Sequence, residues 1–190
     1  SRADHAHLLA LRDKADAILT GAGTLNAQPQ VTLGLGPKSK MNPPLRVIAS
    51  GSGQVNAHHK IFRSPGAPVL VLTTERISRT RLKNLKAAAH NVKIFGADEI
   101  NFKKALAWLQ KEWDVKRLLC EGGGQLNDAL FRAAVVDEVN LTVCPLILGG
   151  REAPTLAEGL GFGQLKDAAR FSLKSCRQLG NEMFLVYRKA

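Results

Sequence analysis

Short runs of apolar residues, each closed by Gly, Pro, Ser or Thr, recur along the first part of the chain. They lie at residues 16–20, 45–49, 68–73, 92–95 and 117–120. Runs that are apolar at nearly every position and rich in β-branched residues are typical of strands covered on both faces. These five runs therefore predict the strands of a mainly parallel sheet.

Helical patterns separate these runs. We expect helices at residues 3–13, from Ser78 to about residue 89, from Asn101 to about residue 112, and after the glycines at 122–124, with Ser78 and Asn101 as N-caps. The apolar residues of the helix that Asn101 caps share one face, and they are Phe102, Ala105, Leu106, Leu109 and Trp113. The alternation of strands and helices predicts an α/β fold with helices on the faces of the sheet.

The last part of the chain has a different pattern. We expect a strand at residues 138–143, followed by an antiparallel hairpin of residues 170–179 and 182–188 around Gly180-Asn181. The predicted fold class is therefore α/β, with a mixed, mainly parallel sheet flanked by helices and a C-terminal antiparallel hairpin added to it. Because no linker composition divides the chain, we expect a single domain over residues 1–190.

Charge narrows the possible partners. The 27 Lys and Arg against 16 Asp and Glu give a formal charge of +11, which predicts an anionic partner. The few aromatic residues are not interleaved with basic ones as base-stacking platforms would be, so nucleic acid is a minor alternative. A basic cluster opens one predicted helix, where a solvated face is favoured over a binding role: Arg76, Arg79, Arg81, Lys83 and Lys86. No apolar run is long enough to span a membrane, and we expect a cytoplasmic protein.

The cysteines and histidines give no metal pattern. Cys120, Cys144 and Cys176 are far apart and form no C-x-x-C, so we expect buried thiols in a reducing compartment. His58-His59 has no third ligand nearby, and we expect it at the surface rather than at a metal.

Two glycine loops directly follow predicted strands. Glu121-Gly122-Gly123-Gly124 opens a helix, where free backbone N–H groups favour a phosphate, although a tight turn alone would also explain the glycines. Gly21-Ala22-Gly23-Thr24 is a weaker signal alone, but both loops fall at carboxyl ends of strands, where open α/β sheets bind ligands. No Asp or Glu occurs between Asp16 and Glu75 to hold a ribose 2′-hydroxyl, which favours NADP over NAD if a dinucleotide binds.

Four segments in this order carry a resemblance to one family: residues 11–32, 118–126, 136–138 and 145–150. Together they resemble the reductase domain of riboflavin biosynthesis, the C-terminal half of the bifunctional deaminase–reductase. The resemblance extends from about Leu8 to Tyr187. It implies a dihydrofolate-reductase-like fold, a homodimer, and a possible deaminase domain upstream. The hairpin offers apolar surface suited to pairing across a two-fold axis, with Phe184, Leu185, Val186 and Tyr187 together.

The resemblance also implies NADPH as cofactor and a phosphoribosylamino-pyrimidine as substrate, with hydride passing to C1′ of the opened ribosyl imine. The implied cofactor-binding residues are Gly21, Gly23, Thr24, Ser50, Gly122, Gly123, Gly124, Gln125 and Leu126, with Thr73, Thr74 and Arg76 at the adenosine 2′-phosphate. The implied substrate residues are Arg12 at the substrate phosphate, Glu121 and Val31. No catalytic acid or base is assigned and no metal is expected.

The chain departs from the family pattern in three places. It lacks the N-terminal strand with which members open, it has Ala27-Gln28-Pro29 where members carry Asp-Asp-Pro, and it has no arginine near Gly34 to hold the substrate phosphate. Two alternatives to the reductase therefore stay open. One is a catalytically silent or altered-substrate relative, and the less favoured one is a basic nucleic-acid-binding domain.

Overall fold

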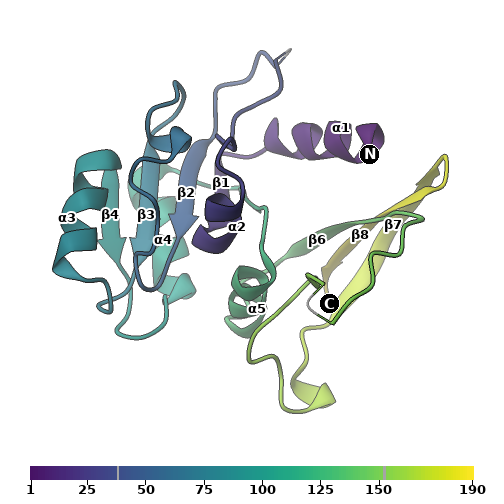
Figure 1. The fold of residues 1–190 in the computed structure, drawn as a ribbon. Coiled ribbons are helices and arrows are strands. Elements are labelled where there is room, and N and C mark those ends of the chain that lie inside the picture. Colours follow the sequence, from purple (N-terminus) through teal and green to yellow (C-terminus); the bar gives the residue numbers. More distant parts are fainter. Residues whose placement is uncertain (38, 152) are drawn as a thin grey trace.

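A five-stranded parallel sheet forms the larger part of the protein, which the computed structural model describes over residues 1–37, 39–151 and 153–190 (Figure 1). The strand order is β4-β3-β2-β1-β5, and every neighbouring pair is parallel. The strands are β1 (Ala17–Gly21), β2 (Leu45–Ala49), β3 (Val69–Thr73), β4 (Asn91–Ile94) and β5 (Leu118–Cys120). Each predicted strand is confirmed to within one residue at either end.

Helices lie between the strands, as the sequence predicts. They are α1 (Arg2–Arg12), α2 (Ala22–Ala27), α3 (Arg79–Ala88), α4 (Phe102–Trp113) and α5 (Gly124–Arg132), with short 3-10 helices η1 (Lys60–Phe62) and η2 (Leu165–Asp167). The predicted caps are confirmed, since the side chains of Ser78 and Asn101 accept hydrogen bonds from backbone N–H groups of α3 and α4. Helix α2 was not expected. It begins directly after β1 because Leu25 is buried in the core, which offsets the low helix propensity of its glycine.

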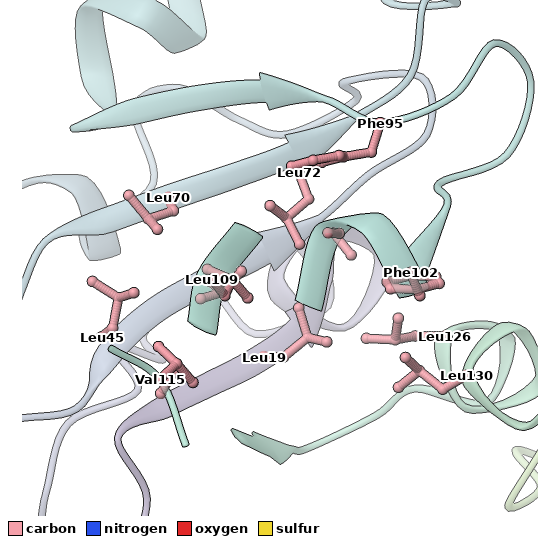
Figure 2. Packing of buried hydrophobic residues seen from close by; sticks show 14 residues of the cluster. Leu19, Leu45, Leu70, Leu72, Phe95, Phe102, Leu109, Val115, Leu126 and Leu130 are labelled. Atoms are coloured by element: carbon pink, nitrogen blue, oxygen red, sulfur yellow. The ribbon is translucent and has the colours of Figure 1, made fainter. Parts of the chain in front are cut away.

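The sheet separates two apolar clusters, because successive residues of a strand point to opposite faces. On one face, residues such as Leu19 and Leu72 pack against Leu109 of α4 and Leu126 of α5 (Figure 2). On the other face, Ile18 and its neighbours on β2 and β3 pack against α2, α3 and η1. Burial on both faces explains why the strands are apolar at consecutive positions.

The remaining strands form a second, antiparallel sheet in the order β6-β8-β7. They are β6 (Glu138–Val143), β7 (Phe171–Leu179) and β8 (Glu182–Lys189), and β7 and β8 form the predicted hairpin, which turns at Gly180 with φ +61°. The α/β fold class with a C-terminal antiparallel hairpin is confirmed. One detail differs from expectation: the antiparallel strands make a sheet of their own rather than extending the parallel one.

Two expectations about single residues are wrong. Cys176 is exposed rather than buried, and Cys120 and Cys144 are half-buried, although all three thiols are free as expected. His59 is buried rather than at the surface. Its Nδ1 accepts a hydrogen bond from the N–H of Ile61 in η1, and its Nε2 lies 3.2 Å from the carbonyl oxygen of Gln28. His58 is exposed as predicted.

The packing predicts the cost of truncating α4. Leu109→Ala removes a fully buried side chain and should lower the free energy of unfolding by about 2–5 kcal/mol. Lys111→Ala, an exposed change on the same helix, should alter it by less than about 0.5 kcal/mol. Urea unfolding of both variants checks this, and equal losses would contradict the assigned core.

Candidate functional site

A cleft of about 1060 Å³ lies at the carboxyl edge of the parallel sheet. Parallel strands direct their carboxyl ends to one edge, which brings together loops that are far apart in the sequence. Eight of the twelve residues expected at the cofactor line this cleft: Gly21, Gly23, Thr24, Ser50, Gly123, Gly124, Gln125 and Leu126. The structure thus joins the two glycine loops and the loop after β2 in one site.

The two glycine loops touch because β1 and β5 are neighbours in the sheet. The N–H of Gly21 donates to the carbonyl oxygen of Gly122 at 3.0 Å, and the Thr20 hydroxyl donates to the same oxygen at 3.4 Å. A Cβ atom on Gly123 would lie 2.9 Å from Oγ1 of Thr24. A glycine at 123 therefore lets the Thr24 hydroxyl approach the backbone of the second loop closely.

Helix α5 opens at this contact. Gly123 is its N-cap residue and supplies no side chain to the first turn. Within the described residues, the first three N–H groups of the helix, those of Gly124, Gln125 and Leu126, have no hydrogen-bond acceptor. Such groups, together with the helix dipole, favour an anion at the mouth of the cleft.

One acidic side chain lies beside this helix start. The side chain of Glu158 packs over Gly124, so that a Cβ there would be 2.7 Å from the Glu158 carboxyl carbon. The Glu158 carboxylate accepts the N–H of Thr155 at 2.8 Å. Asp128 of α5 is buried, and its carboxylate accepts hydrogen bonds from the N–H of Gly161 and from Nε of Arg132. The segment around Glu158 is thereby attached to α5.

Four of the expected cofactor residues do not line the cleft. Thr73 and Thr74 are fully buried, and both hydroxyls donate to the carbonyl oxygen of Gly51, so they support the loop after β2 from behind. Arg76 is exposed outside the lining, and Gly122 is buried with its carbonyl oxygen bonded to β1. These residues follow strand ends at the edge of the sheet where the cleft lies, but the sequence could not show which way they face.

The expected substrate residues Arg12 and Glu121 form a two-pronged ion pair, with Nε and Nη2 each 2.6 Å from a carboxylate oxygen. A third N–H of Arg12 donates to the carbonyl oxygen of Gly34 at 2.7 Å. Since a guanidinium has five N–H groups, two remain for another acceptor within the described structure. Val31, the third residue, packs against the apolar cluster next to Leu33.

Sequence reasoning missed one wall of the cleft, the segment from Asp98 to Lys103 that follows β4. Its position could have been predicted, because β4 is a parallel strand whose carboxyl end lies at the same edge of the sheet. Pro154, Glu158 and Arg132 also line the cleft, and no spacing in the sequence indicated them. Hydrogen bonds to Asp128 and Glu99 raise the pKa of Arg132, which keeps it charged.

Cys120 is the last residue of β5, directly before the second glycine loop, and burial raises the pKa of its thiol to about 11. It is therefore protonated at neutral pH and is a poor nucleophile. Over the described ranges, no three His, Cys, Asp or Glu side chains gather as metal ligands would. None of the described helices has the length and hydropathy to cross a bilayer.

The fold is that of an α/β domain with a cleft at the carboxyl edge of its parallel sheet, and sequence comparison identifies the family. Residues 1–185 match the RibD C-terminal domain, and the chain belongs to this family. The chain is 32% identical over 170 residues to the 2,5-diamino-6-ribosylamino-4(3H)-pyrimidinone 5′-phosphate reductase of Aquifex aeolicus, covering 89% of this chain and 74% of that protein.

Two further comparisons bear on length and fold. The riboflavin biosynthesis protein RibD of Bacillus amyloliquefaciens is 27% identical over 92% of this chain, and the chain spans 47% of that protein, about half of it. The crystal structure of a pyrimidine reductase-like protein from Corynebacterium diphtheriae superposes with a TM-score of 0.80 at 22% identity, covering 100% of this chain and 82% of that one. These findings confirm the expected family and fold.

The contact between the glycine loops predicts a coupling between two substitutions. Gly123→Ala should destabilise the protein by about 1–3 kcal/mol, because the new methyl group overlaps the Thr24 hydroxyl. In a Thr24→Ala background, which removes that hydroxyl, the same substitution should cost at least about 0.5 kcal/mol less. Urea unfolding of the four proteins measures the coupling, and an equal cost in both backgrounds would contradict the contact.

Proposed function

We propose that this protein reduces the ribosyl side chain of a phosphoribosylamino-pyrimidine with NADPH, in riboflavin biosynthesis. The observation that carries the proposal is the single cleft in which both glycine loops meet the start of α5. The relative from Aquifex aeolicus, whose name states this kind of reaction, covers most of the chain and supports the proposal. Membership of a reductase family favours a nicotinamide cofactor.

The chain's residues fit a dinucleotide. The pyrophosphate would lie at the first turn of α5, where the N–H groups of Gly124, Gln125 and Leu126 are free in the described structure and no Cβ at Gly123 fills the approach. Thr24 and Ser50 would contribute hydroxyls from the other two loops. When bound, NADPH supplies the hydride.

A 2′-phosphate would lie beside the loop after β2 rather than at Thr73 and Thr74. Arg81 of α3 donates to the carbonyl oxygen of Ser52 at 3.3 Å, and Ser52 lines the cleft. Arg81 itself lines a pocket of about 440 Å³ that shares Asn26 and Gln54 with the cleft. Arg81 and the hydroxyls of Ser50 and Ser52 would then contact this phosphate.

The substrate would lie at Arg12, Glu121 and Val31. Mutual pairing fixes the Arg12 and Glu121 side chains, which are 14% and 12% exposed, so neither must be ordered when a substrate binds. The free N–H groups of Arg12 would hold the substrate phosphate. The remaining contribution of the chain is to position two ligands and to exclude water, since no general acid or base is assigned.

Other features of the assembly belong to this proposal. We expect a homodimer, because Leu173 of β7 and Leu179 at its end are about half exposed on the hairpin. A deaminase domain upstream is consistent with a chain that spans about half of RibD. Three free thiols fit the reducing environment of the cytoplasm.

The function is tested by mixing the protein with NADPH and the pyrimidinone or uracil form of the phosphoribosylamino substrate, while the loss of NADPH absorbance is followed. We expect NADPH to be oxidised with one of these substrates.

Gln125→Asp places a negative charge at the start of α5 and should weaken NADPH binding roughly five- to ten-fold, because like charges a few ångströms apart in water repel by about 1 kcal/mol. Gln125→Asn, which keeps the side chain neutral, is the matched control.

The outcomes separate the competing functions. NADPH binding without oxidation of either substrate would favour the silent or altered-substrate relative. Equal NADPH affinity in Gln125→Asp and Gln125→Asn would contradict the placement of the pyrophosphate. Affinity for oligonucleotides that falls steeply with salt, in the absence of NADPH binding, would favour the nucleic-acid alternative.

Cofactor preference tests the 2′-phosphate position separately. Arg81→Gln should weaken NADPH binding by about ten-fold or more, since a hydrogen bond to a charged group contributes about 1.5–3 kcal/mol, and should leave NADH binding unchanged. Arg79→Gln, an exposed change on the same helix, serves as the control. Calorimetric titration with both nucleotides measures the two affinities. An equal loss of affinity for NADPH and NADH would contradict this assignment.

A further inference from the structure

A buried histidine lies between two segments that are well separated in the sequence. His59 is 4% exposed and is the N-cap residue of η1. Its Nδ1 accepts a hydrogen bond from the N–H of Ile61 at 3.1 Å, and its Nε2 lies 3.2 Å from the carbonyl oxygen of Gln28. Because Nδ1 is an acceptor, the proton of the neutral ring is on Nε2, which donates to Gln28.

The carbonyl oxygen of Gln28 has a second donor. Gln28 is the C-cap residue of α2, and the N–H of Val31 donates to its carbonyl oxygen at 3.0 Å, which closes a turn over residues 28–31. A carbonyl oxygen has two lone pairs, so the hydrogen bonds from Val31 and His59 can form together. The imidazole ring therefore fixes the same atom that determines where the backbone of Val31 lies.

Other contacts join η1 to this turn. Val31 and Leu33 belong to the same apolar cluster as Ile61, and both Leu33 and Ile61 are buried. On the exposed side, Nζ of Lys60 donates to Oε1 of Gln30 at 3.2 Å. The turn is thus attached to η1 through an apolar contact on one side and through polar contacts at both of its ends.

The turn leads to the residues that the proposed function gives to the substrate. Val31 is one of them. Three residues later, the carbonyl oxygen of Gly34 accepts a hydrogen bond from Nη1 of Arg12 at 2.7 Å. A displacement of the turn would therefore move the backbone of Val31 and the acceptor that orients the Arg12 guanidinium.

Capping alone does not require a histidine before η1. Ser, Thr, Asp and Asn are the preferred N-cap residues, and each could accept the N–H of Ile61 through a short side chain. The imidazole ring differs from them because it carries a second nitrogen on its opposite edge, and this nitrogen reaches Gln28. Burying two polar atoms costs free energy unless both are hydrogen-bonded, as they are in His59. The contact with Gln28 is what distinguishes His59 from an ordinary cap.

We infer that His59 is a positioning residue for the substrate, because its Nε2–H holds the turn of residues 28–31 in the place from which Val31 contacts the pyrimidine. The inference rests on the proposed function for the identity of the substrate. His59 itself touches neither ligand and acts through the carbonyl oxygen of Gln28.

Two substitutions separate the roles of the two ring nitrogens. In His59→Gln, the side-chain amide nitrogen takes the place of Nε2 and can donate to Gln28, whereas the acceptor for the N–H of Ile61 is lost. In His59→Asn, the side-chain oxygen takes the place of Nδ1 and can cap η1, whereas the contact with Gln28 is lost. His58→Asn, an exposed change in the same loop, is the matched control.

Steady-state kinetics with NADPH and the phosphoribosylamino-pyrimidine give the first readout. We expect His59→Asn to raise KM for the pyrimidine about three- to ten-fold, the range that the loss of one net hydrogen bond produces, with kcat unchanged. His59→Gln and His58→Asn should keep KM within about two-fold of the wild-type value. Because His59→Gln leaves the N–H of Ile61 unpaired, it should be less stable to urea than His59→Asn. The order of stability is then opposite to the order of KM, which a merely structural role would not produce.

Amide hydrogen exchange at Val31 gives a second readout that needs no activity. The N–H of Val31 should exchange roughly five-fold or more faster in His59→Asn than in the wild-type protein, because the turn loses its contact with the ring. In His59→Gln and His58→Asn, exchange at Val31 should stay close to the wild-type rate.

NADPH affinity is measured in the same variants, because His59 also lines the smaller pocket beside Arg81. It should not change, since the ring is almost completely buried. Equal weakening of NADPH binding and pyrimidine binding in His59→Asn would assign the residue to the cofactor and overturn the inference.

The readouts distinguish failure of the inference from failure of the proposed function. If the wild-type protein oxidises NADPH with neither pyrimidine, the proposed function fails, while fast exchange at Val31 in His59→Asn alone would still support the hold of His59 on the turn. A KM that is the same in all four proteins, or that rises in step with the loss of stability, would overturn the inference. Equal exchange at Val31 in all four proteins would overturn it as well.

Discussion

The hydrogen bond between Gly21 and Gly122 joins the two loops on which the site depends. It exists because β1 and β5, which are separated by about a hundred residues of sequence, are neighbours in a parallel sheet and end at the same edge. The close approach of Thr24 to Gly123 follows from this pairing, and so does the direction in which α5 leaves the sheet. Without this contact, the free N–H groups of α5 and the first glycine loop would not line one cleft.

Much of the fold follows from the sequence. Five apolar runs bounded by Gly, Pro, Ser or Thr gave the strands of the parallel sheet, and Ser78 and Asn101 marked the starts of α3 and α4. Local pattern could not show that the antiparallel strands form a separate sheet, because strand order depends on contacts between distant segments. Helix α2 was not predicted, because its glycine indicates a loop and the burial of Leu25 is visible only in the packing.

The site was predictable to the level of loops but not of side-chain direction. The rule that ligands bind at carboxyl ends of strands pointed to both glycine loops and to Ser50, and the structure brings these together in one cleft. It also pointed to Thr73 and Thr74, whose hydroxyls turn inwards to Gly51, a fact that only packing reveals. Glu158 comes from a segment far along the chain and lies beside α5 because its N–H donates to the carbonyl oxygen of Gly124 and because Gly161 bonds to Asp128. The sequence has no periodic signal for these contacts.

The net charge of +11 is not concentrated on the residues expected to hold the substrate. Arg12 is neutralised by Glu121, and Arg132 is paired with Asp128 and Glu99. Arg81 on α3 adjoins the cleft through a hydrogen bond to the carbonyl oxygen of Ser52, and Lys103 lines the cleft itself. Under the proposed function, the excess therefore acts mainly as a general field that attracts anionic ligands, while backbone N–H groups and a few arginines would determine where they bind.

The central claim is that the cofactor's pyrophosphate binds at the start of α5. A titration of isotope-labelled protein with NADPH, followed through backbone amide chemical shifts, tests it most directly. The account predicts that the largest shifts fall on Gly124, Gln125 and Leu126, with smaller ones at Thr24 and Ser50. Shifts confined to the hairpin of β7 and β8, or no saturable shift at α5, would contradict it.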